Sequence, residues 1–191
     1  SMKTPPPRPP EAMSLRCKAS LAGADAALIG PGLSVSFDDL ACGNPLSVSP
    51  ASLRGANVLL RTHDQLGAAL ALVALDGIAA RLVIAPPDLK DEHLSDVIAR
   101  AGLDTLVTDD IAAAIDGLKT VLVSPRLSPL GEEPHITQTE WVLFTSGTTG
   151  APKMVAHSLA GLTGAIQPRT DKEKIVWGTF YDTRRYGGLQ I

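Results

Sequence analysis

The sequence has little sulfur and few aromatic side chains. Its two cysteines, Cys17 and Cys42, are too few for a disulfide scaffold and lack the paired spacing of metal ligands. Aromatic residues make up only 4% of the 191 residues, while alanine and leucine abound, so the core has to be aliphatic. These features exclude a small disulfide-rich domain.

The sequence also lacks an excess of charge of either sign. The formal net charge is −3 with 19% charged residues, which excludes a strongly basic nucleic-acid surface. The 45% of hydrophobic residues exclude a disordered chain and suffice for one well-formed core. The composition therefore predicts a globular domain.

No long hydrophobic run is free of charge. The most hydrophobic stretch, Leu66 to Ala85, contains Asp76 and Arg81, whereas a bilayer span needs roughly 20 apolar residues. We expect a buried helix followed by a buried strand there. Residues 1–14 form a proline-rich, disordered tail in which Ser1 resembles a tag remnant. No signal-peptide pattern is present, and we expect a cytoplasmic protein.

Short apolar segments alternate with helical segments through the middle of the chain. The expected strands are Ala26–Ile29, Leu33–Phe37, Asn57–Leu60, Leu82–Ala85, Thr105–Thr108, Thr120–Val123 and Trp141–Phe144. The expected helices start after His63-Asp64 and span Asp91–Ala101 and Ile111–Leu118, and a surface loop spans Ser124–Gln138. This alternation predicts an α/β fold with a mostly parallel sheet flanked by helices on both faces.

One segment carries the chemistry. The strand Trp141–Phe144 leads directly into Thr145-Ser146-Gly147-Thr148-Thr149-Gly150-Ala151-Pro152-Lys153, which holds four hydroxyls, two glycines and a lysine. Glycines let backbone N–H groups approach an anion closely, and the hydroxyls and the lysine add donors and charge. The segment predicts a phosphate-binding loop formed by Thr145, Ser146, Gly147, Thr148, Thr149, Gly150 and Lys153.

Two other phosphate motifs fail on spacing. A Walker loop needs glycine directly before its lysine, where this sequence has Pro152. A dinucleotide fingerprint needs a third glycine after Gly30-Pro31-Gly32, where Val35 stands instead.

The string 145–153 resembles the phosphate-binding loop of the AMP-forming adenylate-forming enzymes, which include acyl-CoA synthetases, luciferases and peptide-synthetase adenylation domains. It matches the family pattern Thr-Ser-Gly-Thr-Thr-Gly-x-Pro-Lys at every specified position. The segment Ala26 to Leu40 also looks like the family's opening hairpin and helix. The resemblance implies part of the large N-terminal domain of such an enzyme, divided here into a first α/β subdomain over 15–138 and the start of a second over 139–191.

The resemblance also implies a substrate pocket. His157 stands four residues after Lys153, where the family often has histidine. The segment Trp177–Leu189 occupies the place of the acyl-pocket motif, which often reads aromatic, His, two residues, Gly, Leu. Arg185 then stands at the histidine position. The implied pocket residues are His157, Arg185, Tyr186, Gly187 and Gly188.

The implied reaction is attack of a carboxylate on the α-phosphate of ATP, followed by transfer of the acyl group to a thiol. Its cofactors would be ATP, Mg²⁺ and coenzyme A. The family's metal-binding glutamate and C-terminal catalytic lysine have no counterpart before Ile191, so the resemblance implies an N-terminal fragment that is inactive alone. The alternatives are an adenylation domain that loads a carrier protein, and a non-catalytic nucleotide-binding or interaction module of the same fold. A homodimer through an exposed edge of the strand Trp141–Phe144 is a further expectation.

Other polar residues have both structural and functional interpretations. Arg184 and Arg185 either bind a substrate carboxylate or a CoA phosphate, or lie on an exposed helix start. His157 is expected to be a packed residue rather than a base. The remaining histidines are scattered and indicate surface or capping positions, as do the acidic pairs Asp91-Glu92 and Glu132-Glu133.

Overall fold

The computed structural model describes residues 13–23, 25–131, 137–145, 152–164, 166 and 182–189. The helices are α1 (Leu15–Leu21), α2 (Phe37–Cys42), α3 (Gln65–Leu75), α4 (Leu94–Ala101), α5 (Leu159–Thr163) and α6 (Tyr186–Leu189), with 3₁₀ turns at Pro50–Leu53, Asp91–His93 and Ile111–Ala113. The strands are β1 (Ala27–Gly30), β2 (Leu33–Ser36), β3 (Gly43–Leu46), β4 (Asn57–Leu60), β5 (Arg81–Ile84), β6 (Thr105–Thr108), β7 (Lys119–Pro129), β8 (Glu140–Thr145) and β9 (Lys153–Ser158).

Within these residues a mixed seven-stranded sheet runs in the order β3-β7-β6-β4-β5-β8-β9, beside a small β1–β2 hairpin. The five inner strands β7, β6, β4, β5 and β8 are parallel, while β3 and β9 add antiparallel edges. The expected α/β fold with a mostly parallel sheet is confirmed.

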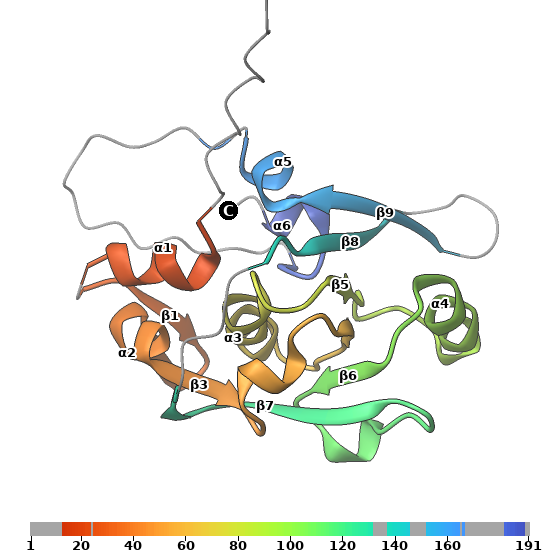
Figure 1. Cartoon of the computed structure of the whole chain (residues 1–191), viewed down its shortest axis with the longest axis horizontal. Coiled ribbons are helices and arrows are strands. Elements are labelled where there is room, and N and C mark those ends of the chain that lie inside the picture. The colour runs from red at the N-terminus through yellow and green to blue at the C-terminus, as the bar shows by residue number, and fades with distance from the viewer. Residues whose placement is uncertain are drawn as a thin grey trace, which may run out of the picture.

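Helices cover both faces of the sheet. Successive residues of β4 point to opposite faces, so Val58 and Leu60 join the core under α3 while Leu59 joins the core under α4. The strands in Figure 1 are stacked from β7 at the bottom to β9 at the top, with α3 and α4 on opposite sides of the stack. Both faces are therefore buried, which explains why these strands are continuous apolar runs.

Local signals fix several of these elements. Asp64 caps α3, accepting a hydrogen bond from the Leu66 N–H. Gly102 ends α4 in the left-handed conformation with φ 60°. The expected strands of the inner sheet and the hairpin Ala27–Ser36 lie within a residue or two of their predicted places, except that β7 continues beyond its predicted end at Val123 to Pro129.

Three expectations are wrong. Residues 111–118 hold only the 3₁₀ turn Ile111–Ala113, because Ala114 is extended and Gly117 has φ 85°, which together end the helix. The expected loop from Ser124 is replaced as far as Pro129 by β7, which pairs with β3. The strand Trp141–Phe144 has no exposed edge, since β8 pairs with β5 on one side and β9 on the other.

A buried carboxylate ties α1 to the sheet. Asp76, at the end of α3, is 6% exposed and accepts hydrogen bonds from the Leu15 N–H at 2.9 Å and from Trp141 Nε1 at 3.0 Å. Burial raises the pKa of Asp76, although both hydrogen bonds act in the opposite direction. The charged form is thus less favourable in the fold than in the unfolded chain.

This raised pKa predicts a pH dependence of stability. The raised pKa of Asp76 contributes to the free energy of unfolding. This contribution is fully present below the ordinary unfolded pKa of about 3.9, and it is lost as pH rises through the folded pKa. We expect the difference in unfolding free energy between wild type and Asp76→Asn to shift against the wild type as the pH rises above the unfolded pKa of about 3.9. Urea unfolding at several pH values measures it, and a pH-independent difference would contradict the assignment.

Among the described residues, no helix is both long and apolar enough to cross a lipid bilayer.

Candidate functional site

The carboxyl ends of the parallel strands gather the polar residues. From β4 the chain proceeds through α3 to β5 on one side, then crosses through α4 to β6 on the other side of β4. In open α/β sheets the crevice at such a reversal of strand order is the usual place for ligands. The loops after β4 and β6 therefore frame a candidate site.

Asp109 joins these two loops. Its carboxylate accepts hydrogen bonds from the N–H groups of His63 and Asp64 at 2.9 Å, and lies 3.3 Å from His63 Nδ1. Desolvation acts to raise the pKa of Asp109, but the hydrogen bonds from the Asp64 and His63 backbones outweigh it and lower the pKa. Asp109 therefore stays ionised at neutral pH and holds the loop after β4 in place.

The ends of the predicted phosphate-binding loop lie at the same edge. Thr145 ends β8, and its register partner in β9 is Lys153, with both residues exposed. The chain between them therefore leaves and returns at the carboxyl edge of the sheet. The predicted loop residues Ser146, Gly147, Thr148, Thr149 and Gly150 lie outside the described residues.

The predicted pocket residues His157 and Tyr186 come together. His157 pairs with Trp141 in the β8–β9 ladder and so lies on the α3 face of the sheet. Its ring is 5.4 Å from that of Tyr186 in α6, with an interplanar angle of 39°. Tyr186 is 44% exposed, so the pair presents a partly open aromatic surface.

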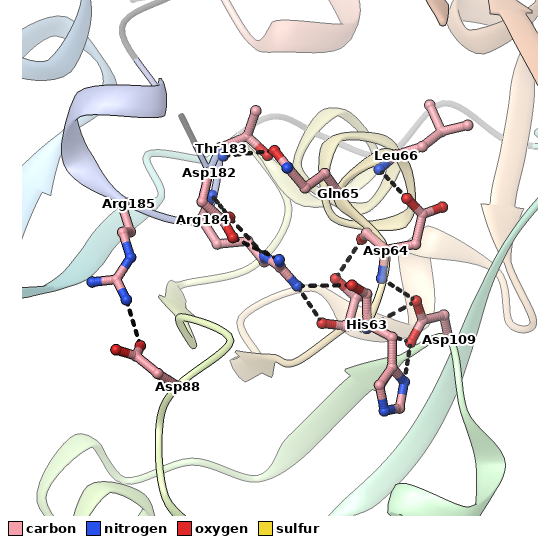
Figure 2. A network of polar contacts seen from close by, with 11 residues as sticks. His63, Asp64, Gln65, Leu66, Asp88, Asp109, Asp182, Thr183, Arg184 and Arg185 are labelled. Carbon is pink, nitrogen blue, oxygen red and sulfur yellow. Dashed lines mark hydrogen bonds and ion pairs between the residues drawn. The ribbon is translucent and has the colours of Figure 1, made fainter. Parts of the chain in front are cut away.

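The two arginines before α6 differ. Arg184 is buried, with its guanidinium between Asp182 and the backbone of the loop after β4 (Figure 2). The alternative of an exposed helix start is wrong for Arg184. Arg185 is exposed and donates to Asp88 after β5 at 2.5 Å, which lowers the pKa of Asp88. Both guanidinium groups are thus already paired with carboxylates.

The two pocket glycines differ in the space around them. A methyl group at Gly188 would collide with the carbonyl oxygen of Asp182, whereas one at Gly187 would meet open space among the described residues. Gly188 therefore permits the close turn that brings α6 back onto Asp182.

We expect Gly188→Ala to loosen α6 while Gly187→Ala leaves it in place. Overpacking costs about 1–3 kcal/mol, so amide exchange over 186–189 should accelerate by roughly tenfold to a hundredfold in Gly188→Ala. Hydrogen exchange measures this, and equal protection in the two variants would contradict the steric argument.

Three acidic residues of this network are not among the residues predicted from the sequence. Asp88, Asp109 and Asp182 each fix a neighbour through hydrogen bonds or an ion pair. Asp109 had a recognisable signal, because it directly follows the apolar strand Thr105–Thr108. Asp88 had no such signal, because its partner Arg185 is distant in sequence. Asp182 had none either, because its partner Arg184 was expected to bind a ligand or to lie on an exposed helix start.

Metal binding has no support in the part of the chain that the structure describes. These residues contain no group of three histidine, cysteine, aspartate or glutamate side chains that could hold a metal ion.

Comparisons with known proteins place this fold. No protein-family model and no curated protein matches the chain. The N-terminal subdomain of Klebsiella oxytoca NpsA matches at TM-score 0.58 and 20% identity, over 78% of this chain and 42% of that structure. A variant of Escherichia coli MenE with bound OSB-AMS matches at TM-score 0.57 and 22% identity, over 78% and 35%. A malonyl-CoA ligase complex with methylmalonyl-CoA and AMP matches at TM-score 0.52 and 22% identity, over 74% and 31%.

The chain thus spans less than half the length of each of these structures. The matched part comprises about three quarters of this chain, 74–78% in the three structures. The chain therefore has the α/β fold of the N-terminal domain of the adenylate-forming enzymes.

Proposed function

We propose that this chain is part of an AMP-forming ligase, which activates a carboxylic acid as an acyl-adenylate and passes the acyl group to a thiol. The observation that carries the proposal is the pairing of Thr145 with Lys153 at the carboxyl edge. This pairing starts and ends the Thr/Ser/Gly segment at the edge where an α/β sheet binds phosphates.

In this proposal the loop holds the β- and γ-phosphates of ATP. Backbone N–H groups around Gly147 and Gly150 and the hydroxyls of Thr145, Ser146, Thr148 and Thr149 would donate hydrogen bonds, while Lys153 would neutralise charge on the leaving pyrophosphate. The carboxylate attacks the α-phosphorus, and the bond to pyrophosphate breaks. Catalysis then consists mainly of positioning and charge stabilisation.

The acid would lie along the surface made by His157 and Tyr186. Tyr186 is partly exposed, and Gly187 leaves open space beside it. Arg185 directly precedes Tyr186, and its ion pair with Asp88 would have to open before it could bind a substrate anion.

We propose coenzyme A as the thiol, with a carrier protein as the alternative. The malonyl-CoA ligase supports the first and an NpsA–ThdA fusion, described as an adenylation–PCP di-domain, supports the second. Both relatives share only the fold with this chain, so the acceptor has to be measured.

The test is acid-dependent exchange of labelled pyrophosphate into ATP, assayed with the gene product that carries this sequence against a panel of aliphatic and aromatic acids. We expect exchange with at least one acid, and thioester formation when CoA is added. Absence of exchange with every acid, together with no pyrophosphate binding by the 191-residue chain in calorimetry, would overturn the proposal. Thioester formation only on a carrier protein would select the alternative acceptor.

A further inference from the structure

Every nitrogen of the Arg184 guanidinium donates a hydrogen bond. Nε and Nη2 donate to the two carboxylate oxygens of Asp182 at 2.7 and 2.6 Å. Nη1 donates to the carbonyl oxygens of Thr62 at 2.6 Å and His63 at 3.1 Å. Figure 2 shows the side chain extending from Asp182 to the loop after β4. The arginine thus connects the segment before α6 to the carboxyl edge of the sheet.

The loop that receives Arg184 is itself fixed. Asp109, at the end of β6, binds the N–H groups of His63 and Asp64. At the start of α3, Gln65 Oε1 accepts a hydrogen bond from the Thr183 N–H at 3.0 Å. The segment 182–184 therefore docks on a loop whose backbone is held by two strands and a helix.

This docking sets the place of Tyr186. The Arg185 N–H donates to the Asp182 carbonyl oxygen at 3.0 Å, and α6 begins at the next residue. The Tyr186 ring then lies 5.4 Å from the His157 ring of β9. A tyrosine two residues after a four-point anchor has little freedom to move relative to the sheet.

The chemistry of the pair explains why arginine is needed. The hydrogen bond from Arg184 is the main cause that lowers the pKa of Asp182, so the carboxylate remains charged beside the buried guanidinium. A lysine has one donating nitrogen and no planar fork, and it cannot reach both carboxylate oxygens and two carbonyls at once.

We propose that Asp182 and Arg184 are the positioning pair of the acid-binding surface: they hold Tyr186 against His157 and so fix the wall on which the carboxylic acid lies. The position of the ring follows from the geometry alone, while the identity of the ligand rests on the proposed function. The pair does not contact substrate in this proposal.

The first experiment needs no activity. In NMR spectra of the full chain, the ring current of Tyr186 should shift the Hε1 resonance of His157. The Tyr186→Leu variant gives the chemical shift of this resonance in the absence of the ring current. We expect Arg184→Lys to move this resonance by most of the same difference. Arg100→Lys is the matched control, because Arg100 forms an exposed pair with Asp96 on α4. An unchanged resonance in Arg184→Lys would overturn the proposal.

Asp182→Asn is the second variant, which preserves the shape of the side chain and removes its charge. If Arg184→Lys unfolds, the Asp182→Asn spectrum decides: the same shift supports the pair, and a wild-type position of the His157 resonance overturns it.

The second experiment separates positioning from general stability. In the pyrophosphate exchange assay, a displaced wall should lower kcat/KM for the acid by up to about a hundredfold, with KM for ATP unchanged. Equal losses for the two substrates would overturn a specific role at the acid surface. If the wild type shows no exchange with any acid and the chain binds no pyrophosphate, the proposed function fails, but the NMR result still decides whether the pair sets Tyr186.

Discussion

Trp141→Ala is expected to lower the free energy of unfolding by about 3–5 kcal/mol, the usual cost of removing a buried tryptophan. Trp141 is 1% exposed, is the second residue of β8 and packs in the core under α3. Its removal leaves a cavity beside a parallel strand and also takes one donor from the buried Asp76. Urea unfolding followed by circular dichroism measures the change.

Two variants separate these contributions. Trp141→Phe retains most of the packing but lacks the indole N–H, so we expect a smaller loss of about 1–3 kcal/mol from the under-bonded carboxylate. Ile111→Ala, at a large hydrophobic residue that is 64% exposed, should change stability by less than about 0.5 kcal/mol. A Trp141→Ala loss as small as that of Ile111→Ala would contradict the burial of this strand.

Lys153→Ala is expected to lower kcat/KM for ATP by roughly tenfold to a hundredfold, since a hydrogen bond to a charged group contributes about 1.5–3 kcal/mol. Lys153 begins β9 at the carboxyl edge of the sheet, beside Thr145. Its removal should affect KM for the acid much less. Pyrophosphate exchange with each substrate varied in turn measures both constants.

Lys119→Ala is the matched control, because Lys119 is an exposed lysine at the amino end of β7, opposite the proposed loop. Gly147→Val provides a second change in the loop, where a β-branched residue would block close approach of the backbone to a phosphate. ATP use that is equal in Lys153→Ala and Lys119→Ala would count against phosphate binding at this edge.

Burial decides which strands could be predicted. The apolar runs Asn57–Leu60, Leu82–Ala85 and Thr105–Thr108 are enclosed on both faces, so their composition alone indicates a strand. Gly43–Leu46 contains glycine and proline and has no alternation, and it becomes β3 only because β7 offers it an edge to pair with. Edge pairing is a tertiary effect that local sequence does not carry.

In the candidate site, too, local sequence patterns could be predicted and tertiary contacts could not. The string 145–153 could be proposed as a phosphate-binding loop because such a loop needs hydroxyls and glycines close together in sequence. His157 and Tyr186 lie close together, and their assignment to one substrate pocket stays a prediction. The burial of Arg184 could not be predicted, because four of its contacts depend on carbonyls and a carboxylate that only the folded chain brings together.

The anchor of Arg184 also constrains the order in which the chain can fold. Its contact with the Thr62 carbonyl spans 122 residues, and this carbonyl is presented only after β4, β6 and α3 have come together around Asp109. Ribosomal synthesis releases the chain from its N-terminus, and long-range contacts form late because closing long loops costs entropy. We therefore expect the sheet to assemble first and to serve as a template for the segment 182–189, so that damage to the loop after β4 delays the maturation of a surface more than a hundred residues away in the sequence.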